Sequence, residues 1–116
     1  MSTWDEYIFS SEVNVDFLDD LVDLDEDDII EAIRDAIVLA AGGDVTDDEM
    51  ENGLAAATIA AIWAGAPFSS GDVVEPFPFI RGLVGEVGDG MNEQALELLE
   101  GVEEDYDLEA FIEALS

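Results

Sequence analysis

Hydrophobic residues recur every three or four positions along most of this chain, which is the spacing of amphipathic helices. The first such run contains Phe17, Leu18 and Leu21, and Val22 extends it. It predicts a helix over about residues 15–23. We expect Asn14 to be the N-cap, because its short side chain can accept a hydrogen bond from the first turn.

A second helix is predicted from about Asp25 to the pair Gly42–Gly43, which is a strong stop signal. Acidic residues crowd its first turn, where they complement the positive end of the helix dipole. Its expected apolar stripe consists of Ile29, Ile30, Ile33, Ile37 and Val38.

The third run is apolar on almost every side. Thr46 and Glu49 match a capping box, in which each side chain bonds to the other residue's backbone N–H. An Ala-rich segment with Ile59, Ile62 and Trp63 follows and predicts a helix over about 47–64. Because it has no polar face, we expect this helix to lie in the centre of the fold.

The remainder of the chain is less regular. Pro67, Pro76 and Pro78 interrupt a Gly-rich segment over about 66–91, for which we predict no long helix. Beyond it, Asn92 and Asp107 are the expected N-caps of two further helices. The predicted fold is therefore all-α: a single domain, residues 1–116, with about five helices around the Ala-rich one.

The charge of the chain changes the picture from an ordinary bundle to a polyanion. There are 31 acidic residues against two basic ones, so the net charge is −29, although 49% of the residues are hydrophobic. A folded domain of this mass exposes about 6,000 Å². Its mean charge density is then about half that of duplex DNA. We expect such a surface to repel nucleic acid and anionic membranes and to attract basic proteins.

Composition also argues against most catalysis. The chain has no His, Lys or Cys, so no Ser or Thr hydroxyl has an ordinary activating base. We predict that the protein is not an enzyme and has no catalytic residues and no cofactor. Asp23, Asp25 and Asp27 copy the first three ligands of a calcium loop, but Asp28 replaces its Gly and Arg34 its final Glu. We therefore predict no metal site there, while weak divalent-cation binding remains an alternative.

Location is inferred from two further observations. The longest apolar run, Leu54–Ala66, is shorter than the roughly 20 residues that span a bilayer. The acidic N-terminus lacks the basic region of a signal peptide. We expect a cytoplasmic protein that does not enter membranes.

The chain resembles a family of small acidic bacterial proteins known only as a domain of unknown function. Members typically open with Trp-Gly-x-Gly-x-Phe-x-Asn-Asp, and Trp4, Phe9, Asn14 and Asp16 look like that opening. Asp5 and Tyr7 stand where the glycines fall, and extra residues separate Phe9 from Asn14. The Ala-rich segment and the final helices are similar to the family's middle and end. The resemblance implies an all-helical fold and no known activity.

These observations favour a non-enzymatic interaction protein that presents its acids to a basic partner protein, either as a DNA mimic or as an immunity-type inhibitor. An alternative is a salt-adapted acidic protein with a structural or unknown role. The oligomeric state stays open between monomer and homodimer. The expected partner-binding residues are Asp16, Asp19, Asp20, Asp23, Asp27, Glu31, Glu97, Glu100, Glu104, Phe77 and Phe79.

Overall fold

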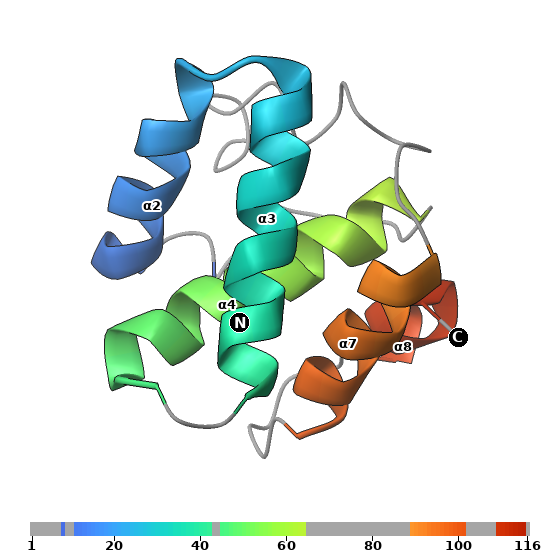
Figure 1. Ribbon diagram of the computed structural model, residues 1–116. Helices are drawn as coiled ribbons and strands as arrows, with labels where there is room; N and C mark the ends of the chain where they lie inside the picture. Colours follow the sequence, from blue (N-terminus) through green and yellow to red (C-terminus); the bar gives the residue numbers. More distant parts are fainter. Residues whose placement is uncertain (1–7, 9–10, 43–44, 65–88, 102–108, 116) are drawn as a thin grey trace.

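Five helices and no strand make up the described part of the chain in a computed structural model (Figure 1). The described residues are 8, 11–42, 45–64, 89–101 and 109–115. The helices are α2 (Glu12–Val22), α3 (Glu26–Ala41), α4 (Asp47–Trp63), α7 (Asp89–Glu100) and α8 (Glu109–Leu115). The all-α prediction is confirmed.

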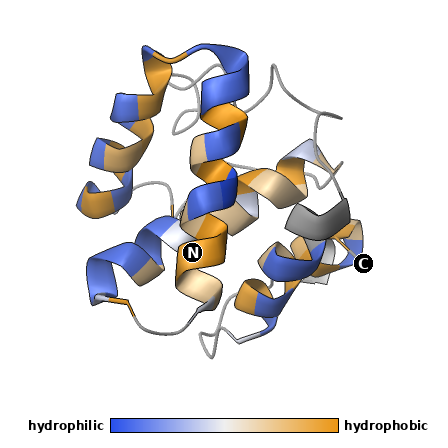
Figure 2. Ribbon diagram, viewed as in Figure 1, coloured by the Kyte–Doolittle hydropathy of each residue, from blue (hydrophilic) through white to orange (hydrophobic). Residues whose placement is uncertain are grey.

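Helix α4 lies at the centre, as its composition predicts. Gly53 and every residue from Ala55 to Trp63 are buried. Figure 2 shows strong hydrophilic colour in α4 only in its first turns, whereas α2, α3 and α7 mix hydrophilic and hydrophobic residues around their axes. Thr58, the buried hydroxyl of α4, donates to the carbonyl oxygen of Leu54 at 2.8 Å. The hydroxyl in the apolar part of the central helix is therefore satisfied within the helix.

The predicted capping box fixes where α4 begins. The backbone N–H of Glu49 donates to Thr46 Oγ1 at 3.2 Å, and the backbone N–H of Thr46 donates to Glu49 Oε1 at 3.1 Å. Two N–H groups that the helix itself leaves unpaired are satisfied in this way.

Helices α3 and α4 approach each other closely at one glycine. A Cβ atom built on Gly53 would overlap the Cβ of Ala40 and lie 3.2 Å from the carbonyl oxygen of Ala36. Small residues on both helices therefore set the distance between their axes. Helix α3 buries Ile29, Ile33 and Ile37 along this contact.

The predicted cap of the first helix is wrong. Ser11 is the N-cap of α2, and Asn14 lies within the first turn, fully buried. Its Nδ2 donates to the carbonyl oxygen of Ile8 at 2.7 Å, and Ile8 is itself in the core. A tertiary contact to the preceding segment, rather than local capping, therefore explains this asparagine.

Three further expectations need correction or lie beyond the description. Val38 and Val22 were expected on apolar stripes, but they are 46% and 40% exposed. Asn92 lies inside α7, which begins at Asp89, so it is not the N-cap. The predicted irregular segment 66–91 is wrong at its end, because residues 89–91 belong to α7; its other residues and Asp107 are outside the described residues.

Packing of the remaining helices completes one core. Ala95, Leu98 and Leu99 of α7, with Phe111 and Leu115 of α8, join the buried cluster around Trp63. No helix in the described ranges is long and apolar enough to cross a membrane.

Candidate functional site

Four of the expected partner-binding acids form a row along α2 and its C-cap. Asp16, Asp19 and Asp20 lie on one side of the helix at i, i+3 and i+4, Asp23 is the C-cap, and all four are exposed. The opposite side buries Leu18 and Leu21 against the core. Burial of the leucines is what turns this acidic row toward water.

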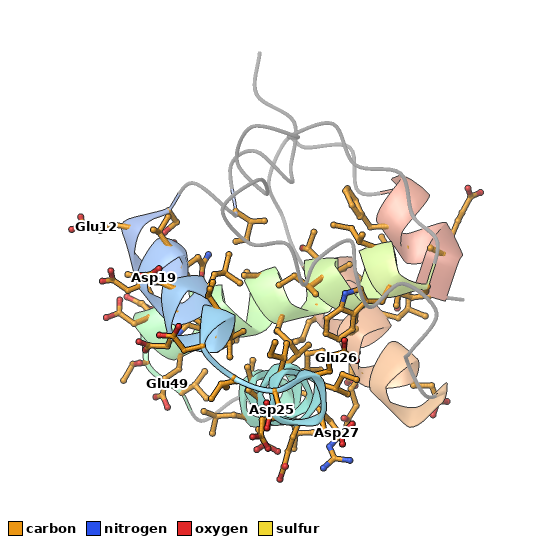
Figure 3. The ribbon with its side chains drawn as sticks, turned by 90° about the horizontal axis from the view of Figure 1, so that it is seen from above. Glu12, Asp19, Asp25, Glu26, Asp27 and Glu49 are labelled. Atoms are coloured by element: carbon orange, nitrogen blue, oxygen red, sulfur yellow. The ribbon has the colours of Figure 1, made fainter. Side chains whose placement is uncertain are left out.

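Burial of the apolar side of the helix likewise leaves the acids of α3 and α7 exposed to solvent. Asp27 and Glu31 are exposed on α3, one turn apart, while Ile29 and Ile33 face the core. Glu97 and Glu100 are exposed on α7. Figure 3 shows the labelled carboxylates Asp19, Asp25, Asp27 and Glu12 spreading outward from α2 and from the start of α3.

The structure does not gather all of these acids into one patch. Helices α2 and α7 lie on opposite sides of α3 (Figures 1 and 3), so their acidic rows point to different parts of the surface. Phe77, Phe79 and Glu104 were also expected in the site, and they lie outside the described residues. Of the expected partner-binding residues, those on α2 and α3 therefore provide the larger acidic surface.

The negative charge density, averaged over the surface of the whole protein, is high. The exposed area of 6324 Å² carries a net charge of −29, about 220 Å² for each excess charge, against about 110 Å² on duplex DNA. Like charges one turn apart on a helix destabilise it. The rows on α2 and α3 thus oppose helix stability, and packing against α4 must compensate.

The calcium-loop resemblance gains no support from the geometry. Asp23, Asp25 and Asp27 are each exposed around the α2–α3 connection. Within the described ranges, no group of three or more acidic side chains lies close enough to hold a metal ion.

A groove between α2 and α3 was not predicted from the sequence. The two helices make few contacts with each other although only residues 23–25 link them, and the first turns of α4 form the floor between them (Figure 1). The groove has a volume of about 420 Å³ and opens to solvent. Its lining residues are Phe17, Ala32, Asp35, Ala36, Leu39, Glu49 and Asn52.

The polar side chains of the groove are two carboxylates and one amide, and the amide oxygen lacks a hydrogen bond within the described part of the chain. Asn52 Oδ1 is buried and has no hydrogen-bond partner among the described residues. Glu49 uses Oε1 for the capping box with Thr46, and Asp35 is exposed at the opposite side of the groove on α3. Figure 3 shows Glu49 between α2 and α3, at the start of α4.

Two sequence signals mark this groove in retrospect. Leu39, 49% exposed, lies outside the Ile29–Ile33–Ile37 stripe, so it has no place in the contact with α4. Asn52 is a polar residue immediately before the fully apolar part of α4. Neither signal identifies a groove by itself, because the lining comes from three helices.

Fold and surface together define a small all-helical protein with a polyanionic exterior and an interior built on an Ala-rich helix. The chain belongs to the family described as Domain of unknown function (DUF4259), which matches residues 2–110. The resemblance to a family of unknown function is thereby supported. No curated protein matches the chain, and no solved structure matches it either.

Proposed function

We propose that this protein is a non-enzymatic interaction protein whose acidic surface binds a basic partner protein. The observation that supports the proposal most is the set of exposed carboxylates on α2 and α3, held outward by a rigid apolar core. An exposed row of charge is costly to stability, and a complementary partner would remove that cost.

Two versions of this function require the same negative electrostatic field around the protein. In a DNA mimic, the carboxylates occupy the positions of phosphates on a DNA-binding protein. In an immunity-type inhibitor, they cover a basic toxin. The two differ in the partner's activity: a mimic competes with duplex DNA for the partner, and an inhibitor blocks its reaction whatever the substrate.

Capture at low salt followed by a salt titration tests the proposal. The immobilised protein should retain one or a few basic proteins from a lysate of its own cells. Affinity for the purified partner should then fall about tenfold or more between about 50 mM and about 500 mM salt, because screening weakens the attraction. Retention of no basic protein, or an affinity independent of salt, would refute the proposal.

Matched charge variants sharpen the test. A triple variant Asp16→Asn, Asp19→Asn, Asp23→Asn removes three charges from α2 and its C-cap, and Glu93→Gln, Glu97→Gln, Glu100→Gln removes three from α7. Since the two rows point to different parts of the surface, a specific partner should respond more strongly to one variant than to the other. Equal small effects would indicate attraction to total charge alone.

Salt adaptation is a second candidate, because exposed acids occur on α2, α3, α4, α7 and α8 alike. In that case the acidic residues allow the protein to fold and stay dissolved in concentrated salt, and they do not bind a partner protein. A melting series in KCl tests it. Complete folding and a monodisperse sample at low salt would exclude this second candidate.

A further inference from the structure

The groove between α2 and α3 has features that acidity alone does not explain. Its walls are largely apolar, with Phe17 on α2 facing Ala32, Ala36 and Leu39 on α3. Its floor at Asn52 contains a buried acceptor without a partner among the described residues. A buried oxygen without a hydrogen bond is destabilising, so rotation of the Asn52 amide toward a donor in the groove would gain that bond.

We infer that this groove binds an arginine side chain of the basic partner. This inference rests on the proposed function and adds to it the site and the chemical group that is recognised. The two carboxylates at the groove, Asp35 and Glu49, together with the net charge of −29, select a cation over an anion or a neutral group.

The volume of the groove favours one side chain over a whole helix. About 420 Å³ is near the lower end of pockets that hold small ligands. An arginine places three methylene groups on apolar walls and a flat guanidinium at the acceptors. The aromatic ring of Phe17 is a surface on which a guanidinium stacks well.

The acceptors of the groove fit arginine better than lysine. Asp35, Glu49 and Asn52 come from two helices, so they approach a ligand from different directions. A guanidinium has five N–H donors in a fixed plane, whereas an ammonium is compact and strongly hydrated. Arginine thus satisfies several separate acceptors at a lower cost of dehydration.

Two synthetic peptides test the inference. Each is an acetylated, amidated Ala-rich 12-mer with three cationic residues, all arginine in one peptide and all lysine in the other. At low salt, calorimetry should show the arginine peptide binding more tightly by about threefold or more. In ¹⁵N-labelled protein, the amides of Ala36 and Leu39 and the side-chain amide of Asn52 should show the largest shifts.

A neutral variant of the groove separates this inference from the general attraction. Ala32→Leu fills the groove without a change of charge, and Ala114→Leu on α8 adds the same bulk at another half-buried alanine. The first should weaken the arginine peptide about fivefold or more, and the second should leave its affinity unchanged. The shift map of the unmodified protein gives an independent result if Ala32→Leu does not fold.

Each outcome bears on a different claim. Salt-sensitive binding of both peptides with equal affinity, unaffected by Ala32→Leu, would overturn the arginine site and leave the proposed function standing. Absence of salt-sensitive binding of either peptide to the unmodified protein would overturn both. Largest shifts at the α7 row instead of the groove would also overturn the arginine site.

Discussion

The two ends of helix α4 differ in polarity and in exposure. Its first turns are polar and partly exposed, and they form the floor of an open groove between α2 and α3. Its last turns are buried among α3, α7 and α8 and contain Trp63, which is 0% exposed. One helix thus belongs both to the closed core and to the open acidic end.

This contrast follows from how charge and apolar residues are distributed. Ala55–Trp63 contains no acid, so neighbouring helices pack on it from several sides. Residues 12–35 combine narrow apolar stripes with rows of acids, and the two helices they form diverge from each other. We infer that packing at the closed end provides most of the free energy of unfolding. This packing offsets the repulsion between the exposed acids at the open end.

Substitution of Trp63 should have the largest effect. Trp63→Ala leaves a cavity in the closed end, and we expect the free energy of unfolding to fall by about 3–5 kcal/mol. Phe17→Ala at the open end removes a half-buried ring and should cost roughly 1 kcal/mol. Urea denaturation followed by circular dichroism measures both, and similar losses would contradict the contrast between the two ends.

Gly53 lies at the boundary of the two regions, and its substitution should have an intermediate effect. Gly53→Ala improves helix propensity, but its methyl group meets Ala40 and the backbone of Ala36, so α3 must move. We expect a net loss of about 1–3 kcal/mol from overpacking. Thermal unfolding compared with the unmodified protein measures this loss.

A matched glycine gives the control for this prediction. A Cβ on Gly101 would lie 3.5 Å from the nearest atom, the carbonyl oxygen of Leu98, which is ordinary contact. Gly101→Ala should therefore be close to neutral. The double variant Gly53→Ala, Ala40→Gly should recover part of the loss, and a purely additive result would show that the two residues do not compete for space.

Local signals predicted much of the fold. The capping box at Thr46 and Glu49 and the apolar run to Trp63 both identify α4, because capping and lack of a polar face depend on sequence neighbours alone. Asn14 and Val38 were misassigned because their environments are tertiary. Asn14 bonds to the preceding segment at Ile8, and Val38 lies beyond the surface that α3 shares with α4.

The candidate site was predictable only in part. Exposure of the acids from Asp16 to Glu31 follows from helical periodicity, and the structure agrees with it. The groove could not be predicted from helical periodicity, because three helices, α2, α3 and α4, together form its lining. An angle between helices depends on side-chain packing across the fold, and no local pattern records it.

A smaller effect than at Trp63 or Gly53 is expected at Thr46. Thr46→Ala removes the hydroxyl that accepts from the Glu49 N–H, and it should lower the free energy of unfolding by about 1 kcal/mol. Thr46→Ser keeps the hydroxyl and should be near neutral. Because the Thr46 hydroxyl also donates to Glu49 Oε1 at the groove, at 3.1 Å, the alanine variant should weaken the arginine peptide as well. Hydrogen exchange should show faster opening in the first turn of α4 than near Trp63, because only the open end loses an interaction. A uniform increase along the whole helix would mean that its two ends unfold as one unit.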